Sequence, residues 1–365
     1  MKVEMKYLHR ILVLFICFLS IKSTEAVVNL KLTSIYYGQQ GFDMDQVHSV
    51  SLWTGRRQAV VVLFTDWCPG SMKNLFDLQL NHIWTNQSIP LITWQITGCN
   101  GKKQPGVMKL IHTNHTFDSY IYEFAIRLRQ WLAGNDGIYG NDDDRRAYLR
   151  LAHEMNGDWY SWSIGSTPTD YVLSWQHIHH ILTTNQSLDS TRLQWIWCVN
   201  NADVGNYTAE EYWVGDNYTN WLGIDGYNFG RSQNWSSWTW PIHVYPHMLG
   251  RLRNLSSTKP IAINEYACSS IDRNHSSMID YKLEWLNQFC NYINNNSIQM
   301  ASYFNKDKET DWAIFGGIRG DMIWNNQNVY SAYKTCLQTD YWIEPNLTNP
   351  RLITDEQFAG FLTNL

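Results

Sequence analysis

Two glutamates in the sequence stand where a carboxylate could take part in acid–base chemistry. Glu154 follows an apolar run and His153, and Trp159 and Trp162 come shortly after it. Glu265 ends a second run rich in apolar residues. Because an unpaired buried charge is strongly unfavourable, each carboxylate must be paired, solvated or functional. Cleavage of a glycosidic bond requires two carboxylates across one bond, one as general acid and one as nucleophile or base.

Each of these residues also has a structural explanation when taken singly. An isolated histidine is more often a hydrogen-bonded structural residue, and a single tryptophan more often packs in a core. The clustering of His153, Glu154, Trp159 and Trp162 favours a functional site. The spacing alone does not say which glutamate would be the acid.

Eight short apolar or β-branched runs alternate with longer stretches of helical periodicity. The runs are nearly continuous rather than alternating, as expected of parallel strands buried on both faces. This pattern predicts one α/β domain folded as a (β/α)8 TIM barrel. A doubly wound open sheet is the alternative, but no glycine-rich phosphate loop follows any run. The predicted strands are 33–39, 59–67, 89–97, 148–155, 193–200, 221–229, 260–267 and 298–305. The predicted helices are 117–132, 171–182, 242–254, 277–293 and 329–337.

Catalytic residues of such a barrel lie at the carboxyl ends of its strands. Glu154 ends the fourth predicted strand and Glu265 the seventh, so the two carboxylates can face each other across the barrel axis. Other polar or aromatic residues also end predicted strands. These are Asp66 and Trp67, Gln95, Asn200, Asp225, Tyr227 and Asn228, Asn264, and Asn305 with Trp312 shortly after.

The composition restricts the partners. Charged residues make up 17% of the 365 residues, the formal net charge is −5, and no basic run occurs, which argues against nucleic acid. Aromatic residues reach 15%, with 19 Trp and 21 Tyr, a content that suits stacking on the apolar faces of sugar rings.

The amino-terminal segment has the pattern of a secretion signal. Basic residues precede an apolar run too short for a comfortable membrane span, so residues 1–26 are predicted to be a signal peptide and 27–365 the barrel domain. A membrane anchor is the alternative. Ten N-x-S/T sequons also suggest a secreted, extracellular glycoprotein. They begin at Asn86, Asn114, Asn185, Asn206, Asn217, Asn234, Asn254, Asn274, Asn295 and Asn346.

Six cysteines follow the predicted signal peptide. None forms a CxxC pair, so we expect no metal site. We predict Cys68–Cys99, after adjacent strands, and Cys290–Cys336, on successive helices. Cys198 and Cys268 belong to non-neighbouring strands, and we expect at least one to remain a free thiol.

Several segments of the sequence resemble a known family. The segment RLAHEMNGDWYSW (150–162) is similar to the strand-four signature of glycoside hydrolase family 26, whose best-known members are endo-β-1,4-mannanases. Further segments resemble that family in the same order, from about residue 35 to residue 330. They are FTDW (64–67), PLITW (90–94), LGIDGYNFG (222–230), PIAINEY (260–266) and FNKDKETDW (304–312).

The resemblance implies a role for each matched residue. Glu154 would be the acid/base, Glu265 the nucleophile, and Tyr227 a hydrogen-bond donor to that nucleophile. His153 and Arg150 would hold the carboxylates and nearby substrate hydroxyls. The sugar-binding surface would be formed by Trp67, Trp159, Trp162 and Trp312.

The resemblance implies an enzyme of the mannan endo-1,4-β-mannosidase type, acting with retention on β-linked polysaccharide. We expect it to be a secreted monomer. We expect no cofactor, because glycoside hydrolysis needs only carboxylates and water. The motifs do not separate mannanases from mixed-linkage β-glucanases or β-1,3-xylanases. A non-catalytic sugar-binding barrel would explain the same aromatic residues, as would a structural glycoprotein in which they only pack. The presence of both glutamates argues against the non-catalytic barrel.

Overall fold

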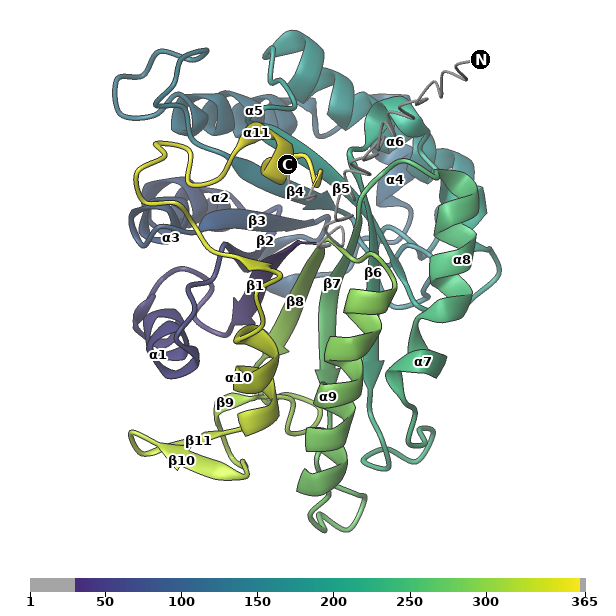
Figure 1. Cartoon of the computed structure of the whole chain (residues 1–365). Helices are drawn as coiled ribbons and strands as arrows, with labels where there is room; N and C mark the ends of the chain where they lie inside the picture. The colour runs from purple at the N-terminus through teal and green to yellow at the C-terminus, as the bar shows by residue number, and fades with distance from the viewer. Residues whose placement is uncertain (1–29, 362–365) are drawn as a thin grey trace, which may run out of the picture.

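Eight parallel strands close into a barrel in the computed structural model, which describes residues 30–361 (Figure 1). Each strand pairs with the next along the chain, and β1 pairs with β8 to close the ring. This confirms the predicted (β/α)8 fold. The barrel strands are β1 (Lys31–Tyr37), β2 (Val60–Asp66), β3 (Ile89–Gln95), β4 (Ala147–Leu151), β5 (Leu193–Asn200), β6 (Trp221–Asn228), β7 (Ile261–Cys268) and β8 (Met300–Asn305).

Helices surround the barrel and cover the outer face of the strands (Figure 1). They are α1 (Asp45–Thr54), α2 (Pro69–Asn74), α3 (Leu80–Thr85), α4 (Val107–Asn114), α5 (Asp118–Leu132), α6 (Pro168–His180), α7 (Pro241–Val244), α8 (Pro246–Leu255), α9 (Ile279–Asn295), α10 (Ser331–Leu337) and α11 (Asp355–Phe358). Short 3-10 or π-helical segments are Leu75–Gln79, Cys99–Gly101, Ile181–Asn185, Ala209–Tyr212 and Asp216–Tyr218. Across residues 30–361, no helix is both long and apolar enough to cross a bilayer.

Several details differ from the sequence prediction. The strand predicted over 148–155 ends at Leu151, so Glu154 lies beyond it. The helix predicted over 242–254 is broken into α7 and α8, because Pro246 begins a new helix and has no N–H to continue the old one. A small antiparallel sheet follows the last barrel strand and was not predicted. It consists of β9 (Phe315–Gly317), β10 (Met322–Trp324) and β11 (Gln327–Val329). Its strands have only three residues each, too few to show a pattern.

The carboxy-terminal segment crosses the amino ends of the barrel strands. β12 (Trp342–Ile343) pairs with β1, and the Tyr148 hydroxyl donates to the Phe358 carbonyl over 3.0 Å. Nη1 of buried Arg146 donates to the Ile353 carbonyl over 2.6 Å. These contacts close the end of the barrel opposite to the two glutamates. The predicted signal peptide, residues 1–26, lies outside the described residues.

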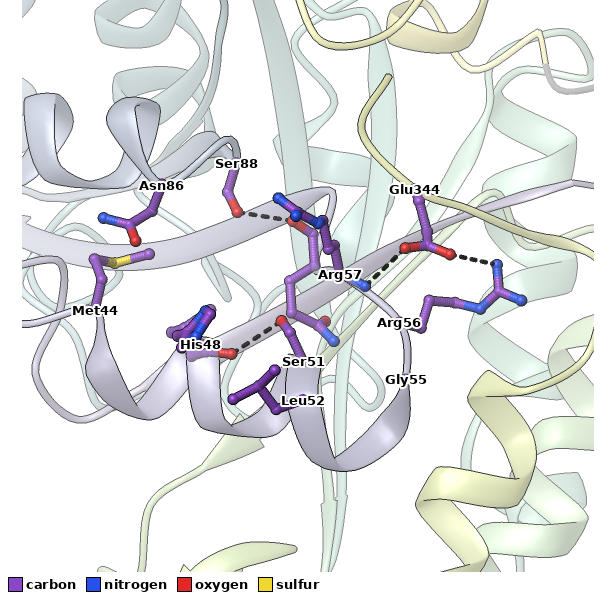
Figure 2. Close-up of a pocket in the computed structure, with 12 residues that line it drawn as sticks. Met44, His48, Ser51, Leu52, Gly55, Arg56, Arg57, Asn86, Ser88 and Glu344 are labelled. Atoms are coloured by element: carbon purple, nitrogen blue, oxygen red, sulfur yellow. Dashed lines mark hydrogen bonds and ion pairs between the residues drawn. The ribbon is translucent and has the colours of Figure 1, made fainter. Parts of the chain in front are cut away.

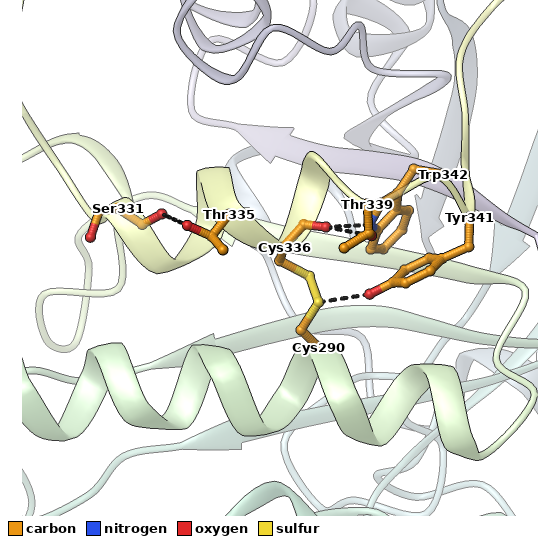
Figure 3. Close-up of a disulfide and its surroundings, with 7 residues drawn as sticks. All are labelled: Cys290, Ser331, Thr335, Cys336, Thr339, Tyr341 and Trp342. Atoms are coloured by element: carbon orange, nitrogen blue, oxygen red, sulfur yellow. Dashed lines mark hydrogen bonds between the residues drawn. A yellow bond between two sulfur atoms is a disulfide. The ribbon is translucent and has the colours of Figure 1, made fainter.

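Both predicted disulfides are confirmed. Cys68–Cys99 joins the segments after β2 and β3, and Cys290–Cys336 joins α9 to α10 (Figure 3). The Tyr341 hydroxyl lies 2.9 Å from Sγ of Cys290 at the second bridge. Among the described residues, Cys198 and Cys268 are free and buried, as the prediction of at least one free thiol requires.

Replacing Cys290 and Cys336 together by serine should lower the free energy of unfolding by about 2–4 kcal/mol, because a bridge restricts the unfolded chain. The matched variant replaces Cys68 and Cys99. Its loss should be slightly smaller, since its sequence separation is 31 residues against 46. Denaturant titration measures both losses. An unchanged free energy of unfolding in both variants would contradict the prediction.

Candidate active site

The two glutamates lie at the carboxyl end of the barrel. Glu154 comes three residues after the end of β4, and Glu265 lies within β7, all of whose residues are buried. Both are largely buried, with 7% and 6% of their surface exposed. A charge on either carboxyl group therefore interacts strongly with neighbouring groups, because little water screens it.

The backbone at the end of β4 turns sharply. Ala152 and Glu154 have φ angles of 43° and 54°, a left-handed conformation that residues other than glycine rarely adopt. Hydrogen bonds hold this turn on both sides. The Ala152 N–H donates to the Trp94 carbonyl over 3.0 Å, and the Glu154 N–H donates to the Cys198 carbonyl over 2.8 Å. Strained backbone held this firmly is typical of functional sites.

Arg150 is completely buried inside the barrel and bridges two carboxylates. Its Nη1 donates to both oxygens of Asp225, over 2.9 and 2.7 Å, and its Nη2 donates to Oε1 of Glu265. Nε donates to the Thr93 hydroxyl over 3.0 Å. Burial alone would lower the pKa of Arg150, but the two carboxylates raise it well above its ordinary value. The guanidinium is therefore a permanent cation at the base of the site.

Both oxygens of Glu265 accept hydrogen bonds. Arg150 donates to Oε1 and the Tyr227 hydroxyl donates to Oε2. Nε2 of His153 lies 3.8 Å from Oε1. Burial, followed by the charge of Arg150, lowers the pKa of His153 well below its ordinary value, so that the imidazole is neutral. Donors to both oxygens fix the orientation of this carboxylate.

Glu154 has the opposite environment. Burial and the nearby charge of Glu265 raise its pKa to about 8, while the hydrogen bond from Nε1 of Trp159 to Oε2, 2.8 Å long, lowers it. At neutral pH Glu154 is therefore protonated. A carboxyl group that carries its proton at neutral pH can serve as a general acid.

The structure separates the four predicted sugar-binding tryptophans. Trp159 is half-buried, beside Glu154. Trp162 is fully buried, donates to the His153 carbonyl over 2.7 Å and stacks on Tyr160 at 4.3 Å, so its predicted contact with sugar is wrong. Its ring lies behind the strand end that precedes Glu154 and supports the site from the protein interior instead.

Trp67 and Trp312 also lie inside the rim, not on an open surface. Trp67 is 8% exposed and packs on Trp94, with ring centroids 5.3 Å apart. Trp312 is 1% exposed and packs against Tyr227 at 5.2 Å and Phe229 at 4.7 Å. The expectation that four rings line one groove is therefore wrong. The short distance in sequence from a strand end predicts that the rings lie near the site. It does not predict the direction in which each ring points.

The sequence prediction missed three contributors to the site. Asp225 was noted only as a strand-end residue, yet it shares Arg150 with Glu265. Trp235 is 73% exposed and extends the aromatic cluster, with its ring 4.7 Å from Phe229. It lies in a loop seven residues after β6. A search restricted to residues at strand ends therefore does not find it.

Lys282 of α9 is the third missed residue, and it holds the loop that carries Trp312. Its buried ammonium donates to the carbonyls of Asp311, Trp312 and Ala313 over 2.8, 2.9 and 3.0 Å. Three carbonyls satisfy the three donors of an ammonium group. A lysine on an amphipathic helix is expected at the surface, so no sequence pattern indicates this role.

His153, Asp225 and Glu265 bring ligand atoms close enough to hold a metal ion. The guanidinium of Arg150, however, already contacts both carboxylates. Because this cation occupies the position between them, the three residues do not fit a metal site.

A cavity of about 300 Å³ lies at the opposite end of the barrel, between α1 and the segments that precede β2 and β3 (Figure 2). Arg56 and Glu344 form an ion pair of 3.3 Å on its wall. The amino ends of barrel strands serve stability rather than catalysis, so this cavity is not the active site.

Comparison with known proteins agrees with the barrel fold. Residues 141–307, which include both glutamates, match the model of "Glycosyl hydrolase family 26". The chain is 32% identical to "Endoglucanase H" of Acetivibrio thermocellus over 241 residues, 64% of this chain and 23% of that protein. It is 24% identical to the "Mannan endo-1,4-beta-mannosidase" of Bacillus subtilis over 212 residues, 52% of this chain and 56% of that protein.

A solved structure of a Bacillus subtilis mannanase superposes with a TM-score of 0.56 at 19% identity, covering 86% of each chain, which supports the fold. The fold and the paired carboxyl groups resemble those of glycoside hydrolases. The part of the chain that matches glycoside hydrolase family 26 is residues 141–307, slightly less than half of it. The chain spans about a quarter and about half of the length of the two curated relatives, respectively.

Replacing Trp159 by phenylalanine should move the alkaline limb of the pH–kcat/KM profile to higher pH. The indole N–H stabilises ionised Glu154, so its removal raises a pKa that is already about 8. A general acid must carry its proton, so activity falls as the pH rises through that value. Hydrolysis measured from about pH 5 to about pH 10 tests this. Trp235→Phe, in the exposed loop, should leave the limb in place. A limb that stays in place or moves to lower pH in Trp159→Phe would contradict the prediction.

Proposed function

We propose that the chain hydrolyses a β-linked polysaccharide with retention of configuration, using Glu265 as nucleophile and Glu154 as acid/base. The observation that carries this proposal is the contrast between the two carboxyl groups. Glu265 accepts hydrogen bonds at both oxygens, whereas burial and the charge of Glu265 keep Glu154 protonated. A retaining glycosidase needs this division of states.

The reaction would proceed in two steps. Glu265 attacks the anomeric carbon while Glu154 gives its proton to the departing glycosidic oxygen, which leaves a covalent glycosyl–enzyme. Once Glu265 is esterified its charge is gone, and one of the two causes that raise the pKa of Glu154 disappears. Glu154 can then act as the base that deprotonates the incoming water.

The neighbouring residues would position these two groups. Arg150 and Tyr227 hold both oxygens of Glu265, and neutral His153 lies beside it. Nδ1 of His153 is buried and has no hydrogen-bond partner among the described residues. Half-buried Trp159 would contact the sugar while holding Glu154.

For the substrate we favour an internal β-1,4-mannosyl linkage. The Bacillus subtilis relative is named for this activity, and the Acetivibrio thermocellus relative for endoglucanase activity. Mixed-linkage β-glucan is therefore the second candidate, and β-1,3-xylan the third. We further propose that residues 1–26 direct secretion, that residues 27–365 form the catalytic domain, and that the protein acts as a monomer outside the cell, free of the membrane.

Substitution of the two glutamates separates their roles. Glu265→Ala should reduce turnover of every substrate to background. Glu154→Ala should slow polysaccharide hydrolysis by about 10²–10⁴-fold, yet spare formation of the glycosyl–enzyme from an activated aryl glycoside, whose leaving group needs no proton. Glu284→Ala, an exposed carboxylate on α9, is the matched control and should retain full activity. The anomer released first, followed by NMR before mutarotation, should be β. An α-anomer would exclude Glu265 as nucleophile.

Purified protein should release reducing sugar from galactomannan faster than from lichenan or β-1,3-xylan. Activity on lichenan alone would overturn the mannan proposal and leave the mechanism intact. Binding to a polysaccharide without any hydrolysis would instead identify a non-catalytic sugar-binding barrel. Neither binding nor hydrolysis would favour a structural glycoprotein.

A further inference from the structure

Three side chains that could bind a metal converge on the outer helical layer, on residues that the catalytic network does not use. His115 directly follows α4, Asp118 begins α5, and His177 lies within α6. Nδ1 of His115 and Nε2 of His177 are 3.3 Å apart. The two oxygens of Asp118 lie 3.2 Å from the His115 nitrogen and 2.7 Å from the His177 nitrogen.

The separations fit a tetrahedral zinc ion. Zinc binds imidazole nitrogen at about 2.0–2.1 Å and carboxylate oxygen at about 2.0–2.2 Å, so neighbouring ligand atoms of a tetrahedron are about 3.3–3.4 Å apart. Two of the three measured separations, 3.3 and 3.2 Å, are close to this value. We propose that His115, Asp118 and His177 form a zinc site, with water as the fourth ligand.

The surroundings favour a cation at this position. His115 follows the carboxyl end of α4, where the unpaired carbonyls of a helix attract positive charge. Asp118 supplies a carboxylate ligand beside the two imidazoles. The side chains of His115, Asp118 and His177 are 56%, 28% and 20% exposed, so an ion can enter from solvent and keep a water ligand.

The alternative is a simple hydrogen-bonded cluster, in which both imidazoles donate an N–H to Asp118. That arrangement directs two N–H groups into the same small space, with their nitrogens 3.3 Å apart. A metal ion would take the place of both N–H protons. It would bind one lone pair from each of the two nitrogens and one from an oxygen of Asp118. Two nitrogen ligands select zinc over magnesium or calcium, which prefer oxygen.

A zinc ion here would connect three elements that are distant in the sequence. α4 and α6 already contact each other through the 2.8 Å pair of His112 with Asp170. The ion would add the start of α5 to this pair. Because the folded chain binds zinc through a preformed site, zinc at about 100 times its Kd should shift the unfolding equilibrium by about 100-fold toward the folded state.

The test uses the whole protein after treatment with a chelator. Asn114 begins a sequon directly before His115, so any glycans are first trimmed to a single sugar. Titration calorimetry with zinc chloride should give one ion per chain, and zinc should raise the Tm while magnesium does not. His115→Gln and His177→Ala should each lose this binding. His243→Ala, which removes an exposed histidine elsewhere, should keep it.

Three results would overturn the proposal. These are no zinc binding by the parent protein, unchanged binding in both His115→Gln and His177→Ala, or an equal rise in Tm with magnesium. Because His115 is exposed, its substitution should leave the fold intact, which circular dichroism verifies. None of these readouts depends on hydrolytic activity, so their outcome is independent of the proposed function.

Discussion

The buried guanidinium of Arg150 is the interaction on which the site depends. It lies between Asp225 and Glu265, and no other cation contacts these two carboxylates among the described residues. Without it, the two carboxylates would face each other in a low-dielectric interior with no cation between them, which is strongly unfavourable. The charge of Glu265 in turn helps to raise the pKa of Glu154. One side chain of β4 thus holds carboxylates of β6 and β7 in place beside the carboxyl group that follows β4.

The order of strands and the position of the glutamates could be predicted because the strands of a barrel have a recognisable sequence pattern. Strands buried on both faces must be apolar along their length, and a polar residue that ends such a run is conspicuous. Glu154 and Glu265 were found in this way, and so was the (β/α)8 architecture. The two disulfides followed from the same topology, since strands and helices adjacent in sequence are adjacent in space.

What could not be predicted depends on side-chain direction and on distant contacts. Trp162 and Trp159 belong to one turn, yet one ring lies behind His153 and the other beside Glu154. Periodicity does not predict rotamers in an irregular segment. Lys282 lies on a helix whose pattern places charged residues outside, and only the loop after β8 provides the carbonyls that bind its ammonium group. The proposed zinc ligands at 115, 118 and 177 could not be found either, because the packing of α4 and α5 on α6 is what joins them.

The two unpaired cysteines constrain how the chain can reach this structure. In the folded protein, burial raises the pKa of the Cys198 thiol well above its ordinary value, and the same cause dominates at Cys268. Thiolate, the form that attacks a disulfide, is therefore scarce, and the two bridges are protected from exchange. Before the barrel closes, both thiols are exposed and as reactive as the other four. The order of events matters for that reason: β5 and β7 must be covered before oxidation is complete, or wrong pairings compete. Productive folding then requires that two sulfur atoms are buried faster than they are oxidised.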